Sequence, residues 1–253
     1  MTNQEEVFNL VRTNSEFINN NKNINSRWKN FVDAVYVIFT GDITDELNLN
    51  LKSQNLDDIV IYLKAPYLRD IKQNYFTSRI DLHGCHISHT LCAEHALENN
   101  YKYILILEDD CWFNKYITDD EINKLIELRN KYNPFMINLS PPEENGFSKQ
   151  KEFNIVKKCS SLTHFIYLNT EGMRKILNTK TCPPPKYFLH PPKNIGTRTL
   201  KSCYFGADEF WTFFTDHYSL EVPYDTSIAC QYKPNRSQNL NRNLRTNFIK
   251  YGM

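Results

Sequence analysis

Three consecutive carboxylates, Glu108-Asp109-Asp110, directly follow the apolar run Tyr103 to Leu107 (YILIL). A run that is apolar on both faces predicts a strand buried between helices, and open α/β sheets bind their ligands at the carboxyl ends of such strands. Because side chains alternate along a strand, we expect Glu108 and Asp110 to share one side and Asp109 to point to the other. Two hard oxygen donors on one side predict a Mg²⁺ or Mn²⁺ site that also takes phosphate oxygens of a substrate. The structural alternative is a solvated acidic turn that caps the next helix.

A second polar cluster, Gly84-Cys85-His86-Ile87-Ser88-His89, lies at the start of the helix predicted just before this strand, over residues 86 to 98. His, Ser and His at this spacing are compatible with a hydrolytic or metal site, but the chain has no G-x-S-x-G, H-E-x-x-H or H-x-x-E-H motif. Ser88 fits a helix cap as well as it fits a catalytic group. Cys85 and Cys92 are seven residues apart on one helix face, which favours core positions for both thiols.

Strands and helices alternate along the chain, and this alternation is typical of an α/β fold. Apolar runs predict strands at 34–39, 59–63, 103–107, 135–139 and 165–168, and the intervening segments predict helices at 43–54, 86–98, 119–132 and 170–178. Thr118, followed by three acids, predicts the start of the third helix, since a helix N-terminus prefers a hydroxyl cap and negative charge. Segments 141–151 and 182–199 are predicted to be long loops, either of the kind that close over ligands or simple surface excursions.

The composition excludes several classes of protein. With 253 residues, 41% hydrophobic and 23% charged, the chain is long enough for one large α/β domain. A net charge of +1 excludes a globally basic nucleic-acid binder, so we predict no nucleic-acid partner. The seven cysteines are an odd number without any C-x-x-C pair, which indicates a reducing compartment. No leader pattern and no transmembrane segment of about 18 apolar residues is found, so the predicted location is cytoplasmic.

The GCHISH block, one helix and the YILILEDD block together resemble glycosyltransferase family 25, in which G-C-x-x-S-H precedes I-L-E-D-D by one helix. That family contains bacterial lipopolysaccharide galactosyltransferases and collagen galactosyltransferases. Further similarities follow in the family's order at residues 162–177, 207–210 and 228–237. The chain departs from the family after its first strand, where Thr40-Gly41-Asp42 replaces an N-L-x-R-R segment that helps to seat the nucleotide.

The resemblance implies a single GT-A-type, Rossmann-like α/β/α domain with a mostly parallel central sheet. This domain would span residues 31–235, after an N-terminal helical extension at 1–30 and before a polar, locally basic tail at 236–253. The implied reaction is metal-dependent transfer of a hexose, galactose or glucose, from a UDP-sugar with inversion. The acceptor would be a hydroxyl of an oligosaccharide or glycoprotein.

The resemblance also implies roles for individual residues, because an inverting transfer must neutralise the UDP leaving group and deprotonate the acceptor. Asp110 would hold Mn²⁺ (or Mg²⁺), with Glu108 near the metal or the ribose. Asp208 aligns with the family's late acid and is the expected general base, with Glu209 as a second candidate or an acceptor-binding residue; a helix cap is the structural alternative for Asp208. The remaining candidates for binding the donor are Asp109, Arg79 and Lys193.

Two other classes of function remain open from the sequence. Clustered acids at a strand end also build the two-metal sites of phosphoryl-transfer enzymes and nucleases. The absent arginine pair is compatible with a degenerate relative that binds a glycan or a partner without turnover. The sequence indicates neither the sugar, the acceptor nor the oligomeric state.

Overall fold

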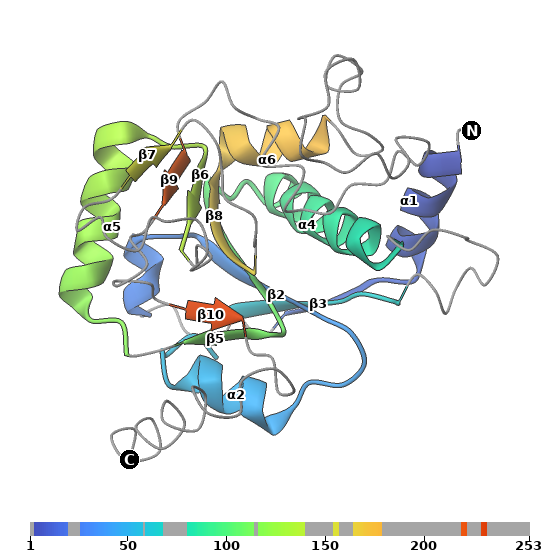
Figure 1. Ribbon diagram of the computed structural model, residues 1–253, viewed down its shortest axis with the longest axis horizontal. Helices are drawn as coiled ribbons and strands as arrows, with labels where there is room; N and C mark the ends of the chain where they lie inside the picture. The colour runs from blue at the N-terminus through green and yellow to red at the C-terminus, as the bar shows by residue number, and fades with distance from the viewer. Residues whose placement is uncertain are drawn as a thin grey trace, which may run out of the picture.

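An eight-stranded sheet forms the centre of the computed structural model within the described residues, which are 3–19, 26–57, 59–67, 80–113, 116–139, 154–156, 164–178, 219–221 and 229–231 (Figure 1). The helices are α1 (Asn3–Thr13), η1 (Arg27–Asn30, a 3₁₀-helix), α2 (Asp45–Lys52), α4 (Ile80–Glu98), α5 (Asp119–Tyr132) and α6 (Thr170–Leu177). The strands of the sheet are β1 (Glu16–Asn19), β2 (Ala34–Phe39), β3 (Val60–Lys64), β4 (Tyr103–Glu108), β6 (Met136–Asn138), β7 (Asn154–Val156), β8 (Phe165–Asn169) and β9 (Ser219–Glu221). A separate two-stranded ribbon pairs β5 (Cys111–Phe113) with β10 (Ala229–Gln231).

The strand order is β1-β3-β2-β4-β8-β6-β9-β7. The pairs β3–β2, β2–β4 and β6–β9 are parallel, and the other four neighbouring pairs are antiparallel. The sheet is therefore mixed, which corrects the expectation of a mostly parallel one. The three adjacent parallel strands are β3, β2 and β4, and β4 ends at the acidic cluster. The hydrophobic pattern of a buried strand does not depend on the direction in which the strand runs. The sequence therefore does not reveal that β8 is antiparallel to its neighbours β4 and β6.

Most elements lie where the hydrophobic pattern predicts them. β2 and α5 have the predicted bounds, and β3, β4, β6 and β8 differ from theirs by one or two residues. Helix α4 begins at Ile80, six residues before the predicted start at His86. The segment expected to be a helical extension also contributes β1, which pairs antiparallel with β3 at the edge of the sheet. The loops at 141–151 and 182–199 and the tail at 236–253 lie outside the described residues.

Alternate residues of each central strand pack into two different cores, because successive side chains point to opposite faces of a sheet. On β4, Leu105 and Leu107 join one core, whereas Ile104 and Ile106 join the other. The first core also takes residues of η1, α2 and α5, and the second takes residues of α1, α4 and α6. Figure 1 shows the resulting three layers, with α4 and α6 on one face of the sheet and α2 and α5 on the other. In the described part of the chain, no helix has the length and apolarity needed to cross a membrane.

Buried amides of α2 and the turn after it fix the segment that follows the acidic cluster. The Asn50 side chain donates to the carbonyl of Cys111 (2.8 Å) and accepts from the amide of Phe113 (3.1 Å), so it clamps both ends of β5. Gln54 accepts from the amide of Ile117 through its side chain (2.9 Å). Its backbone carbonyl accepts from the indole of Trp28 (2.8 Å). These side chains supply partners for backbone groups that would otherwise be buried without a hydrogen bond.

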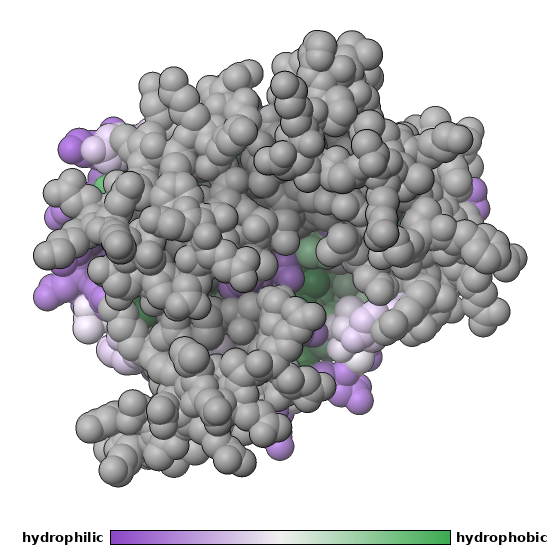
Figure 2. Space-filling view, in the orientation of Figure 1, coloured by the Kyte–Doolittle hydropathy of each residue, from purple (hydrophilic) through white to green (hydrophobic). Residues whose placement is uncertain are grey.

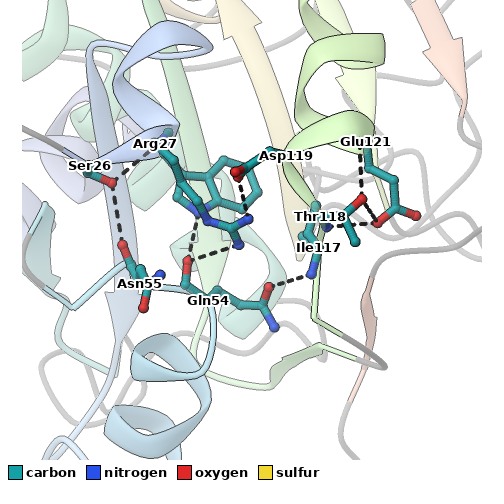
Figure 3. Close-up of polar contacts among 9 residues, drawn as sticks. Ser26, Arg27, Gln54, Asn55, Ile117, Thr118, Asp119 and Glu121 are labelled. Carbon is teal, nitrogen blue, oxygen red and sulfur yellow. Dashed lines mark hydrogen bonds and ion pairs between the residues drawn. The ribbon is translucent and has the colours of Figure 1, made fainter.

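The start of α5 is held by charge and by a capping box. Thr118 accepts from the amide of Glu121, whose carboxylate accepts in turn from the amide of Thr118. Arg27 forms an ion pair with Asp119 (3.0 Å), and its guanidinium lies over the ring of Tyr116, 4.2 Å from the centroid. Figure 3 shows Arg27 between Gln54 and Asp119. Three elements therefore meet here: η1, the start of α5, and the turn that follows α2.

Helix α6 packs against the backbone of Phe135, the residue before β6, at a distance that only glycine allows. A Cβ built on Gly172 would lie 2.2 Å from the carbonyl oxygen of Phe135. The amide of Gly172 donates to the side chain of Asn169, which caps the helix. Glycine is therefore required here by close approach rather than by backbone conformation.

Candidate functional site

A pocket of about 130 Å³ opens at the carboxyl ends of the three parallel strands β2, β3 and β4. Its lining comes from those strand ends and from the first half of α4: Ile38, Phe39, Thr40, Ala65, Pro66, Tyr67, Gly84, Cys85, Ser88, Glu108 and Asp109. Part of this lining is apolar, and part carries a thiol, a hydroxyl and two carboxylates. Figure 2 shows hydrophobic and hydrophilic residues side by side in a hollow near the centre of the face in view. The pocket lies where open α/β sheets bind their ligands.

Glu108 is the last residue of β4, and its side chain meets α4. Its Oε1 lies 3.0 Å from Nε2 of His89 and 3.3 Å from Sγ of Cys85, whose thiol donates to it. The His89 side chain is fully buried, whereas the Glu108 side chain is 23% exposed and reaches the pocket. One carboxylate oxygen is therefore fixed by two donors one helical turn apart.

The environment of Glu108 favours its ionised form. Burial alone raises the pKa of this carboxyl, because a charge is poorly solvated away from water. The hydrogen bond from His89 and its charge lower it, helped by the charge of His164 and by the thiol of Cys85, and the pKa ends below its ordinary value. Glu108 is consequently a carboxylate at neutral pH and a competent ligand for a cation.

Asp109 faces a different environment although it is the next residue. Its Oδ2 accepts from the backbone amide of Thr40 at 3.2 Å, which ties the end of β4 to the end of β2. Burial raises the pKa of Asp109; the Thr40 amide lowers it and the neighbouring Glu108 charge raises it, leaving the pKa above its ordinary value. Two adjacent carboxylates with oppositely shifted pKa values therefore line one pocket.

Asp110 lies in the turn between β4 and β5, and it is not among the described residues that line the pocket. The β5–β10 ribbon pairs Cys111, the residue after Asp110, with Gln231. This pairing brings a segment from far along the chain to the acidic cluster, as Figure 1 shows for β5 and β10. The segment belongs to the stretch 228–237 whose pattern resembles the end of the family motif.

Four of the predicted site residues lie outside the described residues: Arg79, Lys193, Asp208 and Glu209. Of the remaining three, Glu108 and Asp109 line the same pocket and Asp110 follows them in the turn. Ser88 is neither a cap nor at a helix start, because α4 begins at Ile80; its hydroxyl donates to the carbonyl of Gly84 one turn earlier (2.8 Å).

The partners of Glu108 were not assigned to the site from the sequence. The spacing of the two thiols favours core positions for both, and only Cys92 is fully buried; Cys85 contacts Glu108 instead. His89 contacts the same carboxylate, and His164, just before β8, lies close enough to affect its pKa. The i, i+4 spacing of Cys85 and His89 on a helix that leads into the acidic strand is the signal that could have found them.

The fold and the site define an α/β protein with an acidic pocket at the strand ends, and the comparisons with known proteins assign it a family. Residues 15–181 match the family model of glycosyltransferase family 25 (LPS biosynthesis protein). The chain therefore belongs to glycosyltransferase family 25, and its general activity is that of a glycosyltransferase.

Two further comparisons, with curated proteins and with solved structures, assign no function to individual residues. A search of curated proteins finds no match. Among solved structures, the chain is similar to the crystal structure of A197 from STIV, with 10% sequence identity and a TM-score of 0.40 over 76% of this chain and 82% of that one.

Proposed function

We propose that the chain is a metal-dependent, inverting glycosyltransferase that moves a hexose, galactose or glucose, from a UDP-sugar to a hydroxyl of a glycan or glycoprotein. The observation that carries this proposal is the pocket at the ends of β2, β3 and β4, in which Glu108 and Asp109 lie beside an apolar wall. Family membership gives the general class of reaction, and the mixed lining of the pocket supports a donor with both an apolar and a charged part.

The donor set of the site fits a hard divalent cation. Glu108 is held ionised, Asp109 lies beside it, and Asp110 completes a run of three carboxylates at the strand end. Oxygen donors of this kind suit Mn²⁺ or Mg²⁺, which keep positions open for phosphate oxygens. We assign Asp110 and Glu108 as the metal-holding residues, and the bound cation would supply charge neutralisation for the departing diphosphate.

The apolar wall of the pocket fits the part of the donor that carries no charge. Tyr67, 41% exposed, follows β3 and lies at the pocket beside Pro66 and Ala65. A flat, partly exposed ring can pack on the face of a base or a sugar. Glu108 and Asp109, which line the same pocket, would then lie toward the diphosphate.

The acceptor hydroxyl must lose a proton during the displacement, which needs a carboxylate on the side opposite to the leaving group. We assign this general-base role to Asp208, with Glu209 as the acceptor-binding residue and the second candidate for the base. Arg79 and Lys193 are proposed to bind the diphosphate, since guanidinium and ammonium groups are the side chains that pair with phosphate oxygens.

The test is a screen of UDP-sugars for Mn²⁺-dependent release of UDP, with UDP-galactose and UDP-glucose first. Release that requires the cation and rises with a glycan acceptor supports the proposal. A chain that binds UDP but never releases sugar would instead be a binding protein of this family. Cleavage of phosphodiesters without any response to UDP would identify the phosphoryl-transfer alternative.

A further inference from the structure

We propose that Cys85, His89 and Glu108 form a Zn²⁺-binding site that shares Glu108 with the all-carboxylate site proposed above and adds a thiolate and an imidazole. Their Sγ, Nε2 and carboxylate oxygen all lie within 4.8 Å of one another. Among the described residues, this is the group of three potential ligands that converge so closely.

The backbone pre-arranges the two ligands on α4. Cys85 and His89 are four residues apart in a continuous helix, so their side chains lie on one face, one above the other. Glu108 reaches them from the end of β4, and the separations from its Oε1 are 3.3 Å to the sulfur and 3.0 Å to the nitrogen. Atoms that close require only small side-chain shifts to surround one cation, with bonds of about 2.0 to 2.3 Å.

His89 has a second ring nitrogen that its contact with Glu108 does not use. Its side chain is fully buried, and its Nδ1 has no hydrogen-bond partner among the described residues. Ligating histidines bind through one ring nitrogen while the other carries the proton. The geometry directs Nε2 toward the cluster and leaves Nδ1 for that proton.

The mixture of donors selects the cation. A thiolate, an imidazole and a carboxylate are the three ligand types that Zn²⁺ takes in proteins, whereas Mn²⁺ and Mg²⁺ favour oxygen donors throughout. Cys85 lines the pocket, so a cation entering the pocket can reach the sulfur and a fourth ligand can be water. Zn²⁺ is accordingly expected to bind this triad more tightly than Mn²⁺.

Binding must displace the protons that now occupy the cluster. The Cys85 thiol, which donates to Glu108, would give up its proton to solvent when the Zn–S bond forms, and Nε2 of His89 would bind the cation in its unprotonated form. No electron is transferred, and Glu108 is already ionised.

A functional consequence rests on the proposed transferase activity. Glu108 belongs to both donor sets, so a Zn²⁺ ion held by α4 would withdraw this carboxylate from the Mn²⁺ site. Zn²⁺ should then inhibit Mn²⁺-dependent transfer, and Mn²⁺ in excess should relieve the inhibition only weakly.

The experiment measures metal binding on the full-length, reduced chain by titration with Zn²⁺ and with Co²⁺, whose thiolate complexes absorb strongly in the near ultraviolet. Cys85→Ser and His89→Gln should each weaken Zn²⁺ binding at least about 100-fold, since even loss of an outer partner costs about 10- to 100-fold. Cys85→Ser should also remove the Co²⁺–thiolate band. Cys92→Ala and His95→Gln are matched controls on the same helix and should bind as the unmodified chain does.

A second measurement needs no variant and covers the case in which a substituted chain does not fold. Alkylation of Cys85, followed by mass spectrometry on the unmodified chain, should slow at least about tenfold when Zn²⁺ is added, because a bound thiolate is no longer a free nucleophile. Unchanged Zn²⁺ affinity in folded Cys85→Ser and His89→Gln, or unprotected Cys85 at saturating Zn²⁺, would overturn the proposal. Neither readout depends on sugar transfer, so the site and the proposed activity can fail separately.

Discussion

Two buried polar regions lie on opposite faces of the sheet, and they are satisfied in different ways. On the α2 face, the amides of Asn50 and Gln54 bond to backbone groups of the chain around β5. On the α4 face, Cys85 and His89 bond to the Glu108 side chain beside a pocket. Neutral amides bound to backbone can only hold the chain in place, whereas titratable groups bound to each other can exchange a proton for a cation. The first region is expected to set stability and the second to set chemistry.

The largest expected effect concerns catalysis, and it is expected at Asp208 and Glu209. Asp208→Asn should reduce turnover by about a hundredfold to ten-thousandfold with UDP affinity intact, because it removes the proposed general base. Glu209→Gln should have a smaller effect, mainly on the KM for the acceptor. Turnover, UDP affinity and melting temperature of both variants are the measurements.

The assignment of the base passes to Glu209 if only Glu209→Gln is inactive. If Asp208→Asn keeps normal turnover and loses about 1 kcal/mol of stability, the residue is a helix cap.

Glu108→Gln is expected to show the next largest effect. The substitution keeps the shape of the side chain and an oxygen that can accept from His89, but it removes the charge that would face the cation. Turnover should fall by about a hundredfold to a thousandfold, the usual cost of removing one electrostatic partner in an active site. The far-UV spectrum should be unchanged.

Steady-state kinetics at several Mn²⁺ concentrations measure this effect, and the requirement for Mn²⁺ should rise in the variant. Normal turnover with a normal Mn²⁺ requirement would exclude Glu108 from the metal site and remove the functional contrast between the two faces.

Asn50→Ala should show the converse behaviour, with a loss of stability and little change in turnover per folded molecule. It leaves the carbonyl of Cys111 and the amide of Phe113 without partners, and each such buried group costs about 1 to 3 kcal/mol. We expect the free energy of unfolding to fall by about 2 to 6 kcal/mol. Denaturant titration is the measurement.

Asn123→Ala on the exposed face of α5 is the matched control, and its free energy of unfolding should change by less than about 0.5 kcal/mol. A stability of Asn50→Ala equal to that of this control would show that the α2 clamp does not stabilise β5.

The smallest expected effect is on the pH dependence of stability, to which Glu108 and Asp109 should contribute with opposite sign. The pKa of Glu108 is lowered on folding, so its ionised form stabilises the fold above pH 4.5, and this contribution is lost as the pH falls through the folded-state value. The pKa of Asp109 is raised, so its ionisation opposes folding as the pH rises above its ordinary value of 3.8.

At pH 7, Asp109→Asn should therefore raise the melting temperature, by less than about 4 °C, and Glu108→Gln should lower it. Both differences should shrink toward pH 3. Melting curves between pH 3 and pH 7 measure them, and shifts of the same sign in the two variants would contradict the opposite environments of these neighbours.

The hydrophobic pattern was sufficient to predict the strands and the position of the acids, but not what surrounds them. The apolar run YILIL favours a buried strand over other structures, and acids that follow such a strand are expected at the sheet edge, so Glu108 and Asp109 were predictable at the ligand-binding end. Helix α4 begins six residues before the point that composition suggests, which places Ser88 within the helix and turns Cys85 toward Glu108. The antiparallel course of β8 depends on tertiary pairing, which an apolar run does not encode.

The central claim is that carboxylates at the end of β4 hold a cation for sugar transfer, and Asp110→Asn tests it most directly. The measurement is UDP release from a UDP-sugar with Mn²⁺ and with excess EDTA, for the unmodified chain and for Asp110→Asn. We predict that EDTA abolishes release by the unmodified chain and that Asp110→Asn loses nearly all release while its melting temperature is maintained. Full activity in EDTA, or normal turnover of Asp110→Asn, would contradict the claim.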